Sequence, residues 1–158
     1  MLGNVRYHRG DKSPFNGDKM KKLLMIALAA MLVACSSGIN VDELMMKMPK
    51  NDRTFVLQIP TSSNPLSDSM VVGMIKTSGS PSTSSMMQAL SIDNANIGVA
   101  GNSQMINKAT ALYALEHVTQ VGKNVGVYMM GDSESDKADL EKAANRKNIK
   151  LHYFINQK

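Results

Sequence analysis

Short apolar runs alternate with polar stretches of helical spacing along the C-terminal two thirds of the chain. Four of the apolar runs have the length and the β-branched or aromatic content of buried strands, at 54–59, 96–100, 124–130 and 149–155. The stretches between them predict helices from 65 to about 77, around 84–91, from 103 to about 121, and over 134–147. A separate short helix is predicted over 41–48 because Asn40 is a good N-cap and Pro49 ends the pattern.

The chain also contains a short internal sequence repeat. The run 96–99 (Asn-Ile-Gly-Val) precedes Gly-Asn-Ser at 101–103, and the run 124–127 (Asn-Val-Gly-Val) precedes Gly-Asp-Ser at 131–133. Each unit therefore has a strand, a glycine turn, a polar N-cap and a helix. Strands that alternate with helices of this length predict right-handed βαβ crossovers. The expected fold class is α/β: a small, open, mainly parallel four-stranded sheet with helices on both faces.

A different pattern lies near the N-terminus. Lys21 and Lys22 precede an uninterrupted apolar run from Leu23 to Val33, which ends in small residues and in Cys35, the only cysteine. A basic segment, a short apolar core and small residues at a cleavage point are typical of a secretory signal peptide. The run is too short to span a bilayer as a helix, because a span needs about 20 apolar residues.

The four residues Leu32-Val33-Ala34-Cys35 resemble the lipobox of bacterial lipoproteins. The resemblance implies that the sulfur of Cys35 is diacylated, that the leader is removed before Cys35, and that the new amino terminus is acylated. Two or more acyl chains give stable membrane attachment. Ser36 follows the cysteine in place of aspartate, which implies the outer membrane, facing the periplasm, if the host has two membranes. The alternative is a buried core helix with an incidental cysteine.

These signals divide the chain into four parts. Residues 1–19 are polar and aperiodic, and we interpret them as a misassigned N-terminal extension before a true start at Met20; a long basic segment of the signal is the alternative. Residues 20–34 are the predicted signal peptide. Residues 35–52 contain the lipidated cysteine, a tether and the short helix. Residues 53–158 form the predicted α/β domain.

Removal of the leader changes the charge of the chain. The formal net charge is +5, but six of the 18 basic and two of the 13 acidic residues precede Cys35, which leaves twelve and eleven, a net of +1. A basic protein suggests nucleic acid or an anionic surface as partner. The mature part has no basic run, few aromatic residues and no tryptophan. We therefore expect no nucleic-acid partner.

The cysteine count excludes several kinds of chemistry. If Cys35 carries lipid, the domain has no thiol for a disulfide, a nucleophile or a zinc site. Ten methionines remain in the mature part, several of them adjacent, and thioethers bind Cu(I). Methionine also fills cores as a flexible apolar residue, and neighbouring strand residues point to opposite faces. We expect core filling, and neither a metal nor another cofactor.

The predicted topology gathers polar residues at one edge. Ligands of open parallel sheets bind beyond the carboxyl ends of the strands. The candidate binding residues there are Ser62, Ser63, Asn102, Ser103, Lys108, Asp132 and Ser133. Acidic residues already occupy the last helix start, so a phosphate or carboxylate fits better at the neutral start around Asn102, with Lys108 one turn on. Ordinary N-caps that close turns are the alternative interpretation.

Two local motifs suggest chemistry but are incomplete. The triplet Gly131-Asp132-Ser133 is similar to the first block of the SGNH esterases, but that family has Asp-x-x-His near its end, and Ile149 stands three residues before His152. The acidic alternation that starts at Asp132 is typical of a calcium loop but lacks its glycine and its bidentate glutamate. We assign no catalytic residue, and an enzyme is the least favoured class.

Two functions remain open from the sequence. The first is a lipid-anchored envelope protein whose domain is a protein-interaction module for an envelope partner. The second is a receptor for a small anionic ligand at the carboxyl ends of the strands. An exposed apolar patch without a cleft favours the first, and a deep cleft ringed by Asn102, Ser103 and Lys108 favours the second.

Overall fold

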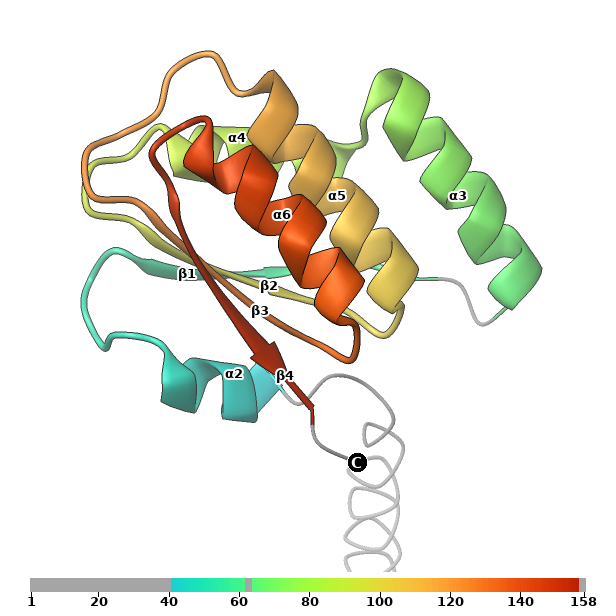
Figure 1. Ribbon diagram of the computed structural model, residues 1–158, viewed down its shortest axis with the longest axis horizontal. Helices are drawn as coiled ribbons and strands as arrows, with labels where there is room; N and C mark the ends of the chain where they lie inside the picture. Colours follow the sequence, from blue (N-terminus) through green and yellow to red (C-terminus); the bar gives the residue numbers. More distant parts are fainter. Residues whose placement is uncertain (1–40, 62–63, 157–158) are drawn as a thin grey trace, which may run out of the picture. The chain divides into compact units, whose positions relative to one another are not determined.

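The computed structural model describes residues 41–61 and 64–156 of the chain (Figure 1). The predicted extension, signal peptide and lipidated Cys35 lie outside the described residues, as do Ser62 and Ser63. In the described ranges, no helix is both long and apolar enough to cross a bilayer.

A single parallel sheet forms the centre of the domain. Its strands are β1 (Thr54–Gln58), β2 (Asn96–Ala100), β3 (Gly126–Gly131) and β4 (Lys150–Ile155). They lie side by side in the order β1-β2-β3-β4, and every pair is parallel. The predicted α/β class with an open four-stranded parallel sheet is confirmed.

The helices cover the two faces of the sheet unequally (Figure 1). One face carries α3 (Pro65–Ser78), α4 (Pro81–Leu90), α5 (Gln104–His117) and α6 (Glu134–Asn145). Of the helices in the described ranges, only α2 (Val41–Lys47) lies on the other face. Right-handed crossovers that always advance to the next strand return over the same face. The sequential strand order therefore explains why all the connecting helices form one layer.

Two apolar clusters follow from this arrangement. The larger one lies between the helix layer and the sheet and includes Val99, Leu115, Val127, Met129 and Leu140. The smaller one lies under α2 and consists of Leu44, Met48, Ala100, Tyr128 and Met130. Neighbouring strand residues such as Met129 and Met130 thus pack into opposite clusters, as the period of a strand requires.

Two helix boundaries differ from the sequence prediction by three residues or more. The helix α5 ends at His117 rather than near Val121, because Val118 has an extended backbone and is buried. The chain then packs against the end of α4, where Gly122 N–H donates to the Leu90 carbonyl at 2.9 Å. The helix α4 begins at Pro81, earlier than predicted, because Ser80 and Thr83 form a reciprocal capping box.

Three asparagines set the entry to consecutive strands. Asn94, Asn124 and Asn148 have φ of 59°, 54° and 54°, and each lies two residues before β2, β3 or β4. Asparagine is one of the few residues that adopts this left-handed conformation readily. Asn94 and Asn124 therefore occupy equivalent positions, and Asn96 lies opposite Gly126 in the sheet. The structural repeat is thus shifted by two residues from the one read in the sequence, which matched Asn96 with Asn124.

Candidate functional site

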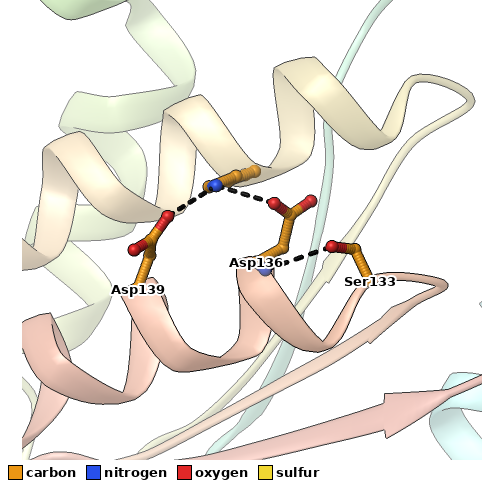
Figure 2. Close-up of polar contacts among 4 residues, drawn as sticks. Ser133, Asp136 and Asp139 are labelled. Atoms are coloured by element: carbon orange, nitrogen blue, oxygen red, sulfur yellow. Dashed lines mark hydrogen bonds and ion pairs between the residues drawn. The ribbon is translucent and has the colours of Figure 1, made fainter.

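The carboxyl ends of β2 and β3 lead into two similar turns. In the first, the Ser103 hydroxyl accepts a hydrogen bond from the Ile106 N–H at 3.4 Å and caps α5. In the second, the Ser133 hydroxyl accepts one from the Asp136 N–H at 3.3 Å and caps α6 (Figure 2). Both serines therefore satisfy helix N–H groups, which is the ordinary role of an N-cap.

The glycines of the same turns allow close packing. A Cβ at Gly101 would lie 2.6 Å from Asn107 Oδ1 and 2.8 Å from the Ile59 carbonyl oxygen. Asn107 is buried, and its side-chain amide donates to the Gly101 carbonyl at 2.9 Å. A Cβ at Gly131 would collide with the Tyr153 hydroxyl. The repeated Gly-polar-Ser motif is thus accounted for by packing and capping.

Lys108 is held by two carboxylates of the neighbouring helix. Its Nζ lies 2.7 Å from Asp136 Oδ1 and 2.8 Å from Asp139 Oδ2. Figure 2 shows both carboxylates on one face of α6, directed toward the adjacent helix. Hydrogen bonds to Asp136 and Asp139 raise the pKa of Lys108, and the hydrogen bond from Lys108 lowers the pKa of Asp139. The lysine charge is therefore engaged within the domain.

A depression of about 510 Å³ lies where β1 and β2 end. It is lined by Val41, Gln58, Ile59, Pro60, Thr61, Ala100, Gly101 and Asn102. Asn102 thus faces this depression, but Ser103 and Lys108 do not line it. Asp132 is exposed at the start of α6. Within the described part of the chain, the predicted anion-binding residues Asn102, Ser103 and Lys108 are thus not brought together around this depression.

The remaining candidate ligands are dispersed. Within residues 41–61 and 64–156, no group of three His, Cys, Asp or Glu side chains is placed to hold a metal ion. Met48 is buried under the sheet, while its neighbours Met45 and Met46 are exposed. The His152 ring stacks on the Tyr128 ring, with centroids 4.4 Å apart, on the face that α2 occupies. Ser133, the candidate esterase residue, is engaged as the cap of α6 on the opposite face.

One helix exposes an apolar surface. On α3, Leu66, Met70 and Met74 recur every four residues and are 77%, 73% and 64% exposed. They share a face with Ser69, Gly73 and Thr77, which are also exposed. We call these six residues the outer face of α3. The opposite side of the helix packs on the core through Val71, Val72 and Ile75.

The sequence interpretation missed this surface although a signal for it is present. The stretch 65–78 is apolar on both sides, with Val71, Val72 and Ile75 on one and Leu66, Met70 and Met74 on the other. A helix with apolar residues all round is normally covered all round. In Figure 1, α3 lies at the end of the helix layer next to α5, so the domain covers one side of it only.

Comparison with protein-family models, with curated proteins and with solved structures found no match.

Proposed function

We propose that this protein is a lipid-anchored component of the bacterial cell envelope whose α/β domain binds a protein partner rather than catalysing a reaction. The anchor is Cys35, and the location is the periplasmic side of the outer membrane where the host has one. The observation that carries the binding role is the outer face of α3. Three large apolar side chains there are more than 60% exposed in a pattern of one per helical turn.

The outer face of α3 would contribute binding energy if a partner covered it. Burial of a Leu or Met side chain contributes about 1.5–3 kcal/mol relative to full exposure. Leu66, Met70 and Met74 leave most of that contribution unused within the described domain. Contiguous exposed apolar surface of this kind is typical of protein interaction sites. A partner that covers all three side chains would gain binding energy from one helix.

A receptor for a small anion has less support. The cation assigned to it, Lys108, contacts Asp136 and Asp139 at 2.7 and 2.8 Å. An anion at the start of α5 would have to compete with two carboxylates that are already in place. The depression beside Asn102 remains the place where such a ligand would be sought.

The anchor is tested by metabolic labelling of the full chain with a clickable palmitate analogue in a bacterial host. We expect the wild-type protein to incorporate the label and to fractionate with membranes. The Cys35→Ser variant should lose the label, because the only sulfur that can carry the lipid is gone. Equal labelling of both proteins would contradict the anchor.

The binding role is tested by photo-crosslinking in intact cells. A photoreactive amino acid at position 70 lies on the outer face of α3, and the matched control is position 138, an exposed alanine on α6. We expect protein adducts from position 70 and few from position 138. Adducts to lipid alone, or equal protein adducts from both positions, would overturn the binding role of α3.

A further inference from the structure

The helix α2 lies close to the proposed anchor along the chain. Only six residue steps lead from Cys35 to Val41, where α2 begins. Whatever its conformation, a chain of that length spans at most about 22 Å. When the acyl chains hold Cys35 at the lipid surface, the start of α2 is therefore never farther than that from the bilayer. This limit rests on the proposed lipidation of Cys35.

The same helix exposes apolar side chains on the side away from the sheet. Leu44 and Met48 are buried against the sheet, whereas Met45 and Met46 are 49% and 72% exposed. A residue two positions along a helix lies on nearly the opposite side, so Met46 points away from the sheet. Figure 1 shows α2 as the outermost described element on this face of the sheet. The two methionines are therefore available to whatever lies beyond that face.

A depression of about 600 Å³ lies beside these two methionines. Its lining includes Met45, Met46 and Pro49, with Asp42 and Lys50 next to them. We call these five residues the outer surface of α2. The single acid and the single base offset each other, so the apolar side chains account for most of what this surface can bind.

We infer that the outer surface of α2 rests on the bilayer that holds Cys35. A small folded domain is about 30 Å across, which exceeds the roughly 22 Å between the lipid surface and the start of α2. A globular partner therefore does not fit between them, whereas the lipid surface is always within reach. Apolar side chains of interfacial helices enter the boundary between headgroups and acyl chains. Methionine is flexible enough to adapt to such an irregular environment.

The anchor is needed because the outer surface of α2 is small. Two methionines on a helix of seven residues give a weak membrane contact when the protein is free in solution. A short tether to the same bilayer turns this contact into an intramolecular one with a high effective concentration. The contact is therefore a property of the lipidated chain.

Contact through α2 also determines which way the domain faces. The helix α3 lies in the helix layer on the opposite face of the sheet from α2 (Figure 1). With α2 on the bilayer, the outer face of α3 is directed away from the lipid, where a protein partner can reach it. The inference thus adds an orientation to the proposed binding role.

A fluorescent probe at position 46 provides a direct test. Cys35 is the only cysteine, and lipidation occupies its thiol, so Met46→Cys gives the lipidated full chain one free thiol. The thiol is labelled with a nitrobenzoxadiazole dye, and the protein is reconstituted into vesicles of phosphatidylethanolamine and phosphatidylglycerol. Some of the lipid carries a nitroxide quencher near the start of its acyl chain. The matched controls are Met70→Cys on α3 and Ala138→Cys on α6, which are also exposed.

We expect the nitroxide to quench the dye at position 46 several-fold more strongly than the dye at 70 or 138. Circular dichroism checks that the three proteins are folded, and mass spectrometry checks that they carry the acyl chains. Adding Met45→Ser to the Met46→Cys protein should weaken the contact equilibrium roughly tenfold, because a second apolar side chain is lost from the outer surface of α2.

The outcomes separate the contact from the anchor. Quenching that is strongest at position 46 and falls with Met45→Ser supports the contact. Acylated protein that floats with the vesicles but shows no quenching at 46, or equal quenching at 46, 70 and 138, overturns the contact and leaves the anchor intact. Protein without acyl chains that does not float overturns the anchor, and the contact with it.

Intact cells test the same surface against a protein occupant. A photoreactive amino acid at position 46 should give lipid adducts, with position 138 as the control. Protein adducts from position 46 would overturn the inference, because a protein would then cover the outer surface of α2.

Discussion

The helices α3 and α5 have the same length but opposite relations to the core. Each has fourteen residues and begins after an extended N-cap whose side chain accepts a hydrogen bond from a backbone N–H. In α3 the Asn64 side chain accepts from Leu66 N–H, and in α5 the Ser103 side chain accepts from Ile106 N–H. Seven residues of α5 are buried, whereas Ile75 is the only buried side chain among the described ones of α3. Apolar content alone therefore does not tell which helix a domain encloses.

The difference lies in neighbours and in side-chain size. In Figure 1, α5 lies between α3 and α6, while α3 has a neighbour on one side only. The buried side of α5 includes Ala109, Ala111 and Ala114, which let adjacent helices approach closely. On α3 the large side chains of Leu66, Met70 and Met74 instead lie on the side that the described domain leaves uncovered.

The largest expected effect is on the enclosed helix. Leu115→Ala should lower the free energy of unfolding by about 3 kcal/mol, because Leu115 is completely buried and its removal leaves a cavity. Urea unfolding followed by circular dichroism measures the change. Met105→Ala, on an exposed part of the same helix, is the control and should have little effect. Equal effects of the two substitutions would show that α5 is not enclosed.

A smaller effect is expected at the single buried side chain of α3. Ile75→Ala should cost about 2 kcal/mol, at the low end for such a truncation, because α3 lies at the end of the helix layer and can shift to fill the gap. The same unfolding measurement applies, with Met74→Ala as the exposed neighbour. A cost as large as that of Leu115→Ala would mean that α3 is held as firmly as α5.

The ion pairs of Lys108 on α5 with Asp136 and Asp139 on α6 should contribute still less to the free energy of unfolding, and their contribution should depend on pH. Lys108→Met should lower stability by about 1 kcal/mol near neutral pH, as expected for a partly exposed ion pair. The pKa of Asp139 is lowered in the folded state, so its contribution is present above the unfolded pKa and is lost as pH falls through the folded value.

The raised pKa of Lys108 affects stability at alkaline pH. Its contribution is present below the ordinary lysine pKa of 10.5 and is lost as pH rises through the folded value. The difference between wild type and Lys108→Met should therefore be largest between these limits and shrink toward strongly acidic pH. A difference that stays constant from pH 2 to 7 would show that packing, not charge, accounts for it.

The smallest effect on folding is expected on the outer face of α3. Met70→Ser should change the free energy of unfolding by no more than about 0.5 kcal/mol, because Met70 is 73% exposed. A large loss of stability would mean that the domain itself covers this face.

The repeating units of the fold were accessible from the sequence. The runs around Val99 and Val127, with their glycine turns and polar caps, predicted parallel strands joined by helices, and the sheet has that form. The order of the strands was not predicted, because nothing local to a strand encodes its neighbour. The single layer of connecting helices follows from that order and was therefore also missed.

The candidate binding residues also show that local sequence does not reveal which distant residues become neighbours. Ser103 and Ser133 were recognised as helix starts, and both cap helices. Lys108 was assigned to an anion because the start of its own helix is neutral. Its partners, Asp136 and Asp139, are 28 and 31 residues away on another helix, and only the packing of α5 on α6 brings them together. Local pattern identifies caps well and long-range ion pairs poorly.

The helix α2 gives the domain a mechanical weak point. It precedes the first strand and is attached to the sheet mainly by Leu44 and Met48, which pack over Gly98. A pull on the chain ahead of Val41 is therefore transmitted to α2 before it reaches any strand. Separating two side chains from the sheet takes less force than shearing a hydrogen-bonded strand from its neighbours. Under such a pull α2 would therefore detach first, and the segment before β1 would extend while the sheet stays folded.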